Sequence, residues 1–145
     1  MRIVTKSTKE TRALASKMAR EILSAKNISH ATVIALKGNL GAGKTTFVQG
    51  FIKVLLPKAR VKSPTFLLIK HYPRRGKDVY HIDCYRVKGP SDLKSLEIKE
   101  VLANPKNIVL IEWPERIQKI LPKNKIIVSM RHKNENERLI NVSGL

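Results

Sequence analysis

The sequence predicts a single α/β domain over residues 1–145, with a mixed, mainly parallel sheet flanked by helices and with antiparallel hairpin strands. Three observations indicate this fold. Short apolar runs rich in β-branched residues alternate with stretches whose apolar residues recur at helical spacing. The chain length of 145 residues suits one domain with a sizeable core. A glycine-rich segment separates one such strand from one such helix, as in phosphate-binding loops.

The N-terminal third predicts a strand, a helix and a second strand. Residues 1–6 form the first short strand, and Ser7 and Glu10 then have the spacing of a capping box. The following helix is expected to end near residues 26–27, and it carries one apolar stripe of Leu14, Met18 and Ile22 beside Ala15 and Ala19. Residues 32–36 form an apolar, β-branched run that predicts a buried strand.

The glycine-rich segment 38–45, Gly-Asn-Leu-Gly-Ala-Gly-Lys-Thr, matches the P-loop pattern G-x-x-x-x-G-K-[ST] of the P-loop NTPase fold. A predicted helix over 46–56, closed by Pro57, follows it. Lys44 is expected to reach the β- and γ-phosphates of a nucleotide, and the Thr45 hydroxyl is expected to bind Mg²⁺. The predicted nucleotide-binding residues are Asn39, Leu40, Gly41, Ala42, Gly43, Lys44, Thr45 and Thr46.

The second half predicts a hairpin, a helix and a buried central strand. Pro64 favours an extended turn before two strands, 66–72 and 78–84, whose short connection predicts an antiparallel hairpin. Four consecutive apolar residues at 108–111 indicate a strand buried on both faces. The remaining predicted elements are a helix opening at 89–92 and ending at 104–105, a short helix over 115–121, and closing strands over 125–131 and 138–142.

Two carboxylates follow predicted strands and complete the candidate site. No Asp or Glu occurs between Glu21 and Asp78, so the P-loop needs a metal-linked carboxylate from elsewhere in the chain. Ligands of open α/β sheets bind outside the carboxyl ends of the strands. Glu112, after 108–111, is therefore the first choice for Mg²⁺, and Asp83 is the second, as a metal partner or a water-orienting group. A surface salt bridge at a strand end is the alternative for each.

Other residues near these motifs have both a functional and a structural interpretation. Thr65 can sense a γ-phosphate or simply belong to a turn. Arg86 and Arg116 can counter phosphate charge or pair with nearby acids. His71 and His81 lack the spacing of metal ligands and are interpreted as strand residues.

Composition limits the class of protein and suggests its partners. The net charge of +18 indicates an anionic partner, either a nucleotide, RNA or an acidic protein surface, although the basic residues are spread along the whole chain. The single cysteine, Cys84, excludes an internal disulfide and fits a cytoplasmic protein. The N-terminus lacks the features of a signal peptide, and no apolar run approaches a membrane span.

Four motifs together resemble the TsaE (YjeE) family over nearly the whole chain. They are the P-loop with Thr46, Ser63-Pro64-Thr65-Phe66, His81-Ile82-Asp83-Cys84-Tyr85-Arg86 and Ile111-Glu112-Trp113-Pro114-Glu115. A P-loop alone is common, whereas the other three motifs in this order are specific. Two positions depart from the family, which often has an acid where Asn39 stands and a Glu where His71 stands.

The resemblance implies a small Mg²⁺-dependent ATPase required for threonylcarbamoyladenosine (t6A) at position 37 of tRNA. It implies TsaD-like and TsaB-like partners, with ATP keeping their complex turning over, and contact with tRNA through that complex. The net charge leaves open whether the basic surface also contacts tRNA directly or contacts a protein. It also implies metal-linked roles for Thr45 and Glu112 and a role in ATP hydrolysis for Asp83. The predicted catalytic residues are Lys44, Asp83 and Glu112.

Two other classes of function stay open on sequence alone. A small-molecule or nucleoside kinase needs an acceptor pocket and commonly an Arg-bearing lid, for which Arg74-Arg75 is the only paired cluster. An RNA-binding module with an inactive P-loop suits the net charge. However, aromatic residues make up only 5% of the chain, which is few for a base-stacking surface.

Overall fold

The computed structural model describes residues 1–26, 29–62, 68–88, 92 and 95–145. They form a seven-stranded sheet in the order β1-β7-β6-β2-β5-β4-β3. The elements in chain order are β1 (Arg2–Thr5), α1 (Thr8–Ser24), β2 (Thr32–Lys37), α2 (Lys44–Leu55), β3 (Ile69–Tyr72), β4 (Asp78–Asp83), α3 (Ser95–Ala103), β5 (Asn107–Glu112), the 3₁₀ helix η2 (Pro114–Ile120), β6 (Ile126–His132) and β7 (Arg138–Ser143).

The centre of the sheet is parallel and both edges are antiparallel. Strand β2 pairs in parallel with β5 and β6, and β4 pairs in parallel with β5. The β3–β4 hairpin forms one edge, and β7 with β1 forms the other. This arrangement confirms the predicted mixed α/β sheet, with parallel pairing limited to the four central strands.

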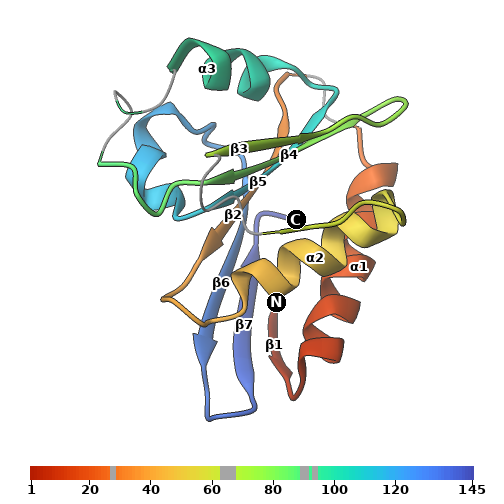
Figure 1. Ribbon diagram of the computed structural model, residues 1–145, viewed down its shortest axis with the longest axis vertical. Coiled ribbons are helices and arrows are strands. Elements are labelled where there is room, and N and C mark those ends of the chain that lie inside the picture. The colour runs from red at the N-terminus through yellow and green to blue at the C-terminus, as the bar shows by residue number, and fades with distance from the viewer. Residues whose placement is uncertain (27–28, 63–67, 89–91, 93–94) are drawn as a thin grey trace.

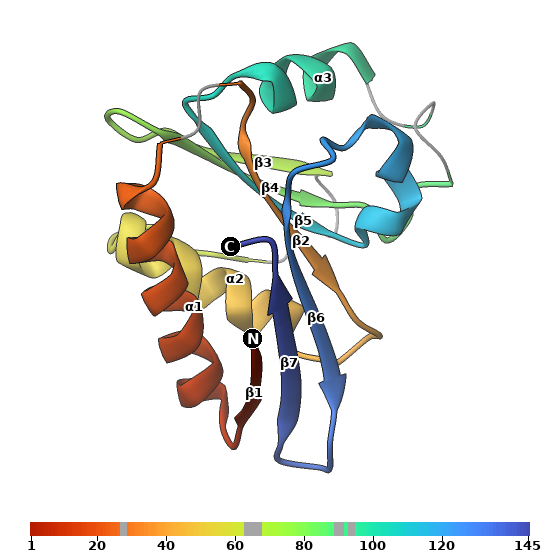
Figure 2. The ribbon, with the colours of Figure 1, turned by 180° about the vertical axis from the view of Figure 1, so that it is seen from behind.

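Helices cover both faces of the sheet (Figures 1 and 2). Helices α1 and α2 pack on one face, in a core that includes Ile108 and Leu110 of β5. Helix α3 and η2 contribute to the core of the other face, which includes Val109 and Ile111 of the same strand. All six residues of β5 are buried, because alternate side chains of a strand enter opposite cores. The predicted central strand is thus confirmed.

One predicted element differs from the structure, and others lie partly outside the described residues. The predicted α-helix over 115–121 is instead the 3₁₀ helix η2, in which Ile117 leaves helical geometry at φ −127° and ψ 22°. Pro114 at its start and Pro122 just beyond leave too few residues for a regular α-helix. The Ser63-Pro64-Thr65-Phe66 motif and the predicted helix start at 89–91 lie outside the described residues, and β3 is described only from Ile69.

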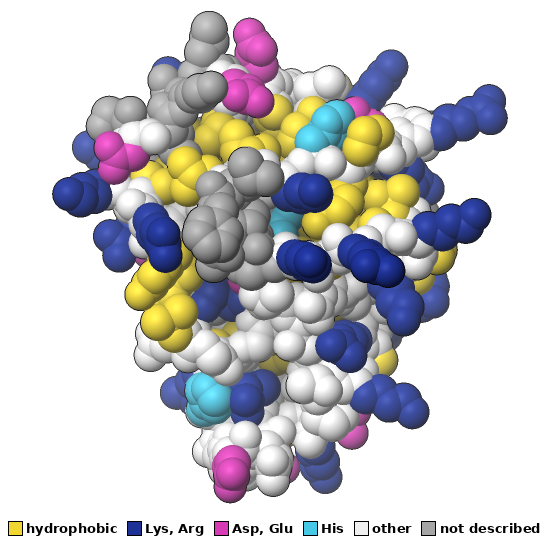
Figure 3. Space-filling model, in the orientation of Figure 1, with side chains coloured by type: hydrophobic (Ala, Val, Ile, Leu, Met, Phe, Trp, Pro, Cys, Tyr) yellow, Lys and Arg dark blue, Asp and Glu magenta, His cyan; other side chains and the backbone are white. Residues whose placement is uncertain are grey.

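The basic residues are spread over the surface (Figure 3). Lys and Arg side chains project from most of the face shown, with few acidic side chains between them. On this face the positive charge is therefore spread out and does not gather in one patch. Within the described part of the chain, no helix has the length and apolar character needed to cross a membrane.

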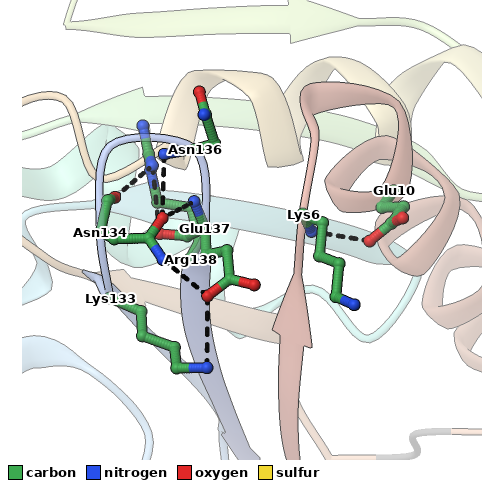
Figure 4. A network of polar contacts seen from close by, with 7 residues as sticks. All are labelled: Lys6, Glu10, Lys133, Asn134, Asn136, Glu137 and Arg138. Atoms are coloured by element: carbon green, nitrogen blue, oxygen red, sulfur yellow. Dashed lines mark hydrogen bonds and ion pairs between the residues drawn. The ribbon is translucent and has the colours of Figure 1, made fainter.

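Local polar contacts hold the two turns at one end of the β1–β7 edge, where Thr5 is aligned with Arg138 (Figure 4). The backbone N–H of Glu10 donates to Ser7 Oγ at 3.1 Å, which confirms the cap of α1, while the Glu10 carboxylate accepts from the backbone N–H of Lys6 at 2.7 Å. In the β6–β7 turn, the Asn134 side chain accepts from the backbone N–H of Glu137 at 2.8 Å. Short, local hydrogen bonds therefore hold both turns at this end of the edge.

Replacing Gly50 by alanine is expected to destabilise the packing of α1 on α2. A Cβ at Gly50 would lie 2.5 Å from both Cα and the carbonyl oxygen of Arg12, and neither backbone atom can move aside easily. Overpacking typically costs ~1–3 kcal/mol, which outweighs the ~1 kcal/mol of helix propensity that alanine adds. Because the clash is with backbone atoms, we expect a cost in the upper part of that range and a net loss of roughly 1–2 kcal/mol in the free energy of urea unfolding.

The matched control is Lys53→Ala on the exposed side of α2. This variant is expected to stay within about 0.5 kcal/mol of the wild type. Equal stability of Gly50→Ala and the wild type would show that the two helices are not packed as described.

Candidate nucleotide-binding site

The glycine-rich loop joins the carboxyl end of β2 to the first turn of α2. Gly43 is the N-cap of α2, with φ 101°, a left-handed conformation that glycine adopts without strain. A Cβ at Gly38 would clash with the carbonyl oxygen of Met130, so the loop also needs a residue without a side chain there. No side chain caps α2 and its first turn contains no acid. The first backbone N–H groups of α2 can therefore face an anion.

Lys44 is folded back onto its own loop. Its Nζ donates to the carbonyl oxygens of Gly38 and Asn39, the latter at 2.9 Å, and lies 4.5 Å from the centroid of the Trp113 ring. Burial lowers the pKa of Lys44, against the opposing effect of Glu112, Asp83 and other acids. Among the described residues no ion pair joins Lys44 to a carboxylate. The ammonium is thus held by neutral partners that a phosphate can replace.

The register of the parallel strands brings the predicted carboxylates to this loop. Asp83 of β4 is aligned with Glu112 of β5, and Glu112 is aligned with Leu36 of β2. Because all three strands run in the same direction, their carboxyl ends meet at one edge of the sheet. The Thr45 hydroxyl donates to Oε1 of Glu112 at 3.3 Å. The structure therefore brings Thr45, Asp83 and Glu112 together with the P-loop.

Glu112 has a second partner that sequence reasoning missed. His81 Nε2 lies 3.1 Å from Glu112 Oε2, and the two side chains are only 0% and 3% exposed. The sequence interpretation gave His81 no role beyond that of a strand residue. The available signal was its position two residues before Asp83, because residues i and i+2 of a strand share a face.

Asp83 is half-buried at the edge of the cleft. Its Oδ1 accepts from the backbone N–H of Tyr85 at 2.9 Å, and burial raises the pKa of its carboxyl group. The next residue, Cys84, faces the core, where burial raises the pKa of its thiol to about 12. Asp83 is therefore the chemically available group of this segment, whereas the cysteine is inert.

Residues of the P-loop, together with Asp83 and Glu112, line a cleft of about 350 Å³. Six of the eight predicted nucleotide-binding residues line it, whereas Asn39 and the buried Ala42 do not. Arg86 lines the cleft, as does Tyr85, which sequence reasoning did not propose, while Arg116 and the hairpin residues Arg74 and Arg75 do not. Two larger hollows, of about 450 and 670 Å³, are lined by no P-loop residue. Thr65 lies outside the described residues.

The donor set fits Mg²⁺ bound together with a nucleotide. The Thr45 hydroxyl and the Glu112 carboxylate present oxygen atoms, which are the ligands that Mg²⁺ prefers. Over the described ranges, no group of three or more His, Cys, Asp or Glu residues is arranged to hold a metal ion. Mg²⁺ needs no such cage, because it commonly binds through one or two protein ligands, substrate phosphates and water.

Replacing Asp83 by asparagine is expected to stabilise the fold at neutral pH. Burial makes the folded chain hold the Asp83 proton more tightly than the unfolded chain does. Folding stability therefore falls as pH rises from the ordinary aspartate pKa of about 3.9 through the folded-state pKa. An uncharged asparagine side chain would avoid this loss, and its carbonyl oxygen could still accept from the backbone N–H of Tyr85. We therefore expect a higher free energy of unfolding for the variant than for the wild type at pH 7.

Chemical unfolding of both proteins at pH 7 and near pH 4 tests this sign. The gain is expected to shrink at the lower pH, because protonation removes the buried charge from the wild type. A variant that is less stable than the wild type at pH 7 would contradict the assigned burial cost.

Comparisons with known proteins agree in one family. The family model described as "Threonylcarbamoyl adenosine biosynthesis protein TsaE" matches residues 5–140. The protein named "tRNA threonylcarbamoyladenosine biosynthesis protein TsaE" of Haemophilus influenzae is 40% identical over 110 residues, 76% of this chain and 69% of that protein. Its namesake in Rickettsia typhi is 36% identical over 137 residues, 94% of this chain and 90% of that protein.

A solved structure has the same fold. The structure titled "Crystal structure of Bacillus subtilus YdiB" superposes with a TM-score of 0.73 at 28% sequence identity. The superposition covers 97% of this chain and 82% of the other.

Proposed function

The chain belongs to the TsaE family. We propose that it is an ATP-binding and ATP-hydrolysing subunit required for t6A formation in tRNA. It acts in the cytoplasm with TsaD-like and TsaB-like proteins, and it contacts tRNA through their complex and through its own basic surface. The observation that carries the proposal is the 3.3 Å hydrogen bond from the Thr45 hydroxyl to Oε1 of Glu112, in the cleft that the P-loop lysine also lines.

Nucleotide binding uses the loop and the helix that follows it. The backbone N–H groups at the start of α2 receive phosphate oxygens, and no acidic side chain in the first turn repels them. Lys44 leaves the carbonyl oxygens of Gly38 and Asn39 and turns to the phosphates. This exchange replaces hydrogen bonds to neutral carbonyls by stronger bonds to charged oxygens.

Hydrolysis follows from positioning and charge neutralisation. Thr45 and Glu112 would hold Mg²⁺, which neutralises phosphate charge when it is bound. Asp83, whose pKa is raised, is suited to orient a water molecule and to accept its proton. Arg86 lines the same cleft and adds a positive charge near the phosphates. The protein forms no covalent intermediate in this scheme.

The two rival functions have less support in the geometry. A kinase lid built on Arg74 and Arg75 would have to reach the cleft, but both residues belong to the turn between β3 and β4, and neither lines the cleft. An RNA-binding module has no need for the buried Glu112 beside Thr45. The broad positive surface suits tRNA as a partner of an ATPase equally well (Figure 3).

The test is complementation of cells depleted of their own TsaE protein. Wild-type chain is expected to restore t6A in total tRNA, measured by mass spectrometry, and to co-purify with a TsaD-like protein. A chain that binds Mg·ATP yet neither restores t6A nor co-purifies with such a partner would contradict the proposed role. ATP turnover that strictly requires an added nucleoside would favour the kinase instead.

A further inference from the structure

We propose that His81 is a positioning residue for the metal-linked carboxylate. Its Nε2–H holds one oxygen of Glu112, so that the other oxygen stays directed at Thr45, the residue with which Glu112 would hold Mg²⁺. This inference rests on the proposed function, because it concerns how the same site keeps its shape before the nucleotide arrives.

The geometry gives each oxygen of Glu112 a separate partner. Oε2 lies 3.1 Å from Nε2 of His81, and Oε1 lies 3.3 Å from the hydroxyl of Thr45. His81 is in β4 and Glu112 in β5, which are paired in parallel, while Thr45 is in the first turn of α2. Three elements therefore fix one carboxylate from two sides, which leaves it little freedom to rotate.

The surroundings of His81 favour a hydrogen on the ring nitrogen that faces Glu112. Nδ1 of His81 is buried and has no hydrogen-bond partner among the described residues. An N–H at Nδ1 would therefore lack an acceptor, while Nε2 would face a carboxylate oxygen without a hydrogen between them. Both losses are avoided when the hydrogen is on Nε2, so His81 donates to Glu112.

Without His81, Oε2 of Glu112 would be a buried carboxylate oxygen that lacks a hydrogen-bond donor. Glu112 is only 3% exposed, so water cannot easily satisfy Oε2. The nearby charged donor is Lys44, which lines the same cleft as Glu112. If Glu112 turned to Lys44, the cleft would lose both its metal ligand and its free ammonium. His81 prevents this by occupying Oε2.

The alternative is that His81 only fills the core. Three variants separate the two roles. His81→Gln keeps a side-chain N–H at about the reach of Nε2, whereas His81→Leu keeps the bulk and removes the donor. His71→Leu is the matched control, because His71 is the other histidine of the β3–β4 hairpin and is exposed. Thermal unfolding shows that each variant is folded before it is compared.

The measured quantity is metal affinity, read separately from activity. Mn²⁺ is titrated into each protein saturated with ADP and followed by electron paramagnetic resonance, and ADP affinity is measured without metal. For His81→Leu we expect roughly a tenfold weaker Mn²⁺ affinity, in the range usual for partners that orient metal ligands. ADP affinity without metal should be unchanged. His81→Gln should recover most of the loss, and His71→Leu should match the wild type.

A folded His81→Leu protein with wild-type Mn²⁺ affinity would overturn the proposal. Equal loss in the Gln and Leu variants would also overturn it, because it would point to packing alone. If the wild type binds no nucleotide, the proposed function is wrong. The role of His81 is then tested on the protein without nucleotide or metal. Nitrogen-15 NMR of the free wild type is then expected to show the hydrogen on Nε2, and a hydrogen on Nδ1 would overturn it.

Discussion

Replacement of Lys44 by alanine is expected to lower ATP turnover by roughly 100- to 1,000-fold, the usual effect of removing one donor that stabilises developing charge. Lys44 supplies the ammonium group of the P-loop. Among the described residues, no carboxylate forms an ion pair with it that would compete with the phosphates of a nucleotide. Phosphate release at saturating Mg·ATP measures the effect, and nucleotide affinity should fall as well.

The fold should tolerate this change. Burial disfavours the charged form of Lys44 and lowers its pKa, so the ammonium stabilises the native state little. Thermal unfolding of Lys44→Ala is therefore expected to stay close to that of the wild type. Lys53→Ala, on the exposed side of the same helix, should keep full turnover. A folded Lys44→Ala protein with normal turnover would remove Lys44 from the site.

Replacement of Glu112 by alanine is expected to abolish measurable hydrolysis, with a fall of at least about 100-fold. The change removes the carboxylate that contacts Thr45, and it leaves the buried His81 without its acceptor. Nucleotide binding without metal should persist, because the loop amides and Lys44 remain. Phosphate release and ADP binding, measured with and without Mg²⁺, separate these two effects.

Glu115→Gln is the matched control, because Glu115 is an exposed carboxylate three residues further along the chain. It is expected to change turnover less than about threefold, since it does not line the cleft. Undiminished Mg·ATP turnover in Glu112→Ala would refute the metal-linked role.

Local patterns predicted most of the fold. The four apolar residues at 108–111 indicated a strand buried on both faces, and β5 separates two cores as expected. The capping residues Ser7 and Glu10 marked the start of α1 correctly. The 3₁₀ geometry of η2 was not predicted, because apolar spacing over seven residues scarcely distinguishes it from an α-helix.

The site could be predicted only in part. Asp83 and Glu112 were found because each ends a strand, and strand ends can be recognised from local sequence. The bond between His81 and Glu112 joins residues 31 positions apart, and it depends on which strands are neighbours and in which register. The contact between the Lys44 ammonium and the Trp113 ring likewise joins residues far apart in the sequence, and local patterns did not predict the left-handed backbone of Trp113, at φ 57°. A single sequence does not show which strands are neighbours or in which register they pair, so these contacts could not be predicted from it.

Phosphate release from ATP by the purified chain, with no acceptor added, decides whether this cleft hydrolyses ATP. We expect slow turnover that requires Mg²⁺, stops when EDTA is added, and increases with TsaD-like and TsaB-like partners. The same measurement on Glu112→Ala should give only background. Release that is absent with and without those partners, or that appears only with an added nucleoside, would contradict the assignment of this cleft to ATP hydrolysis.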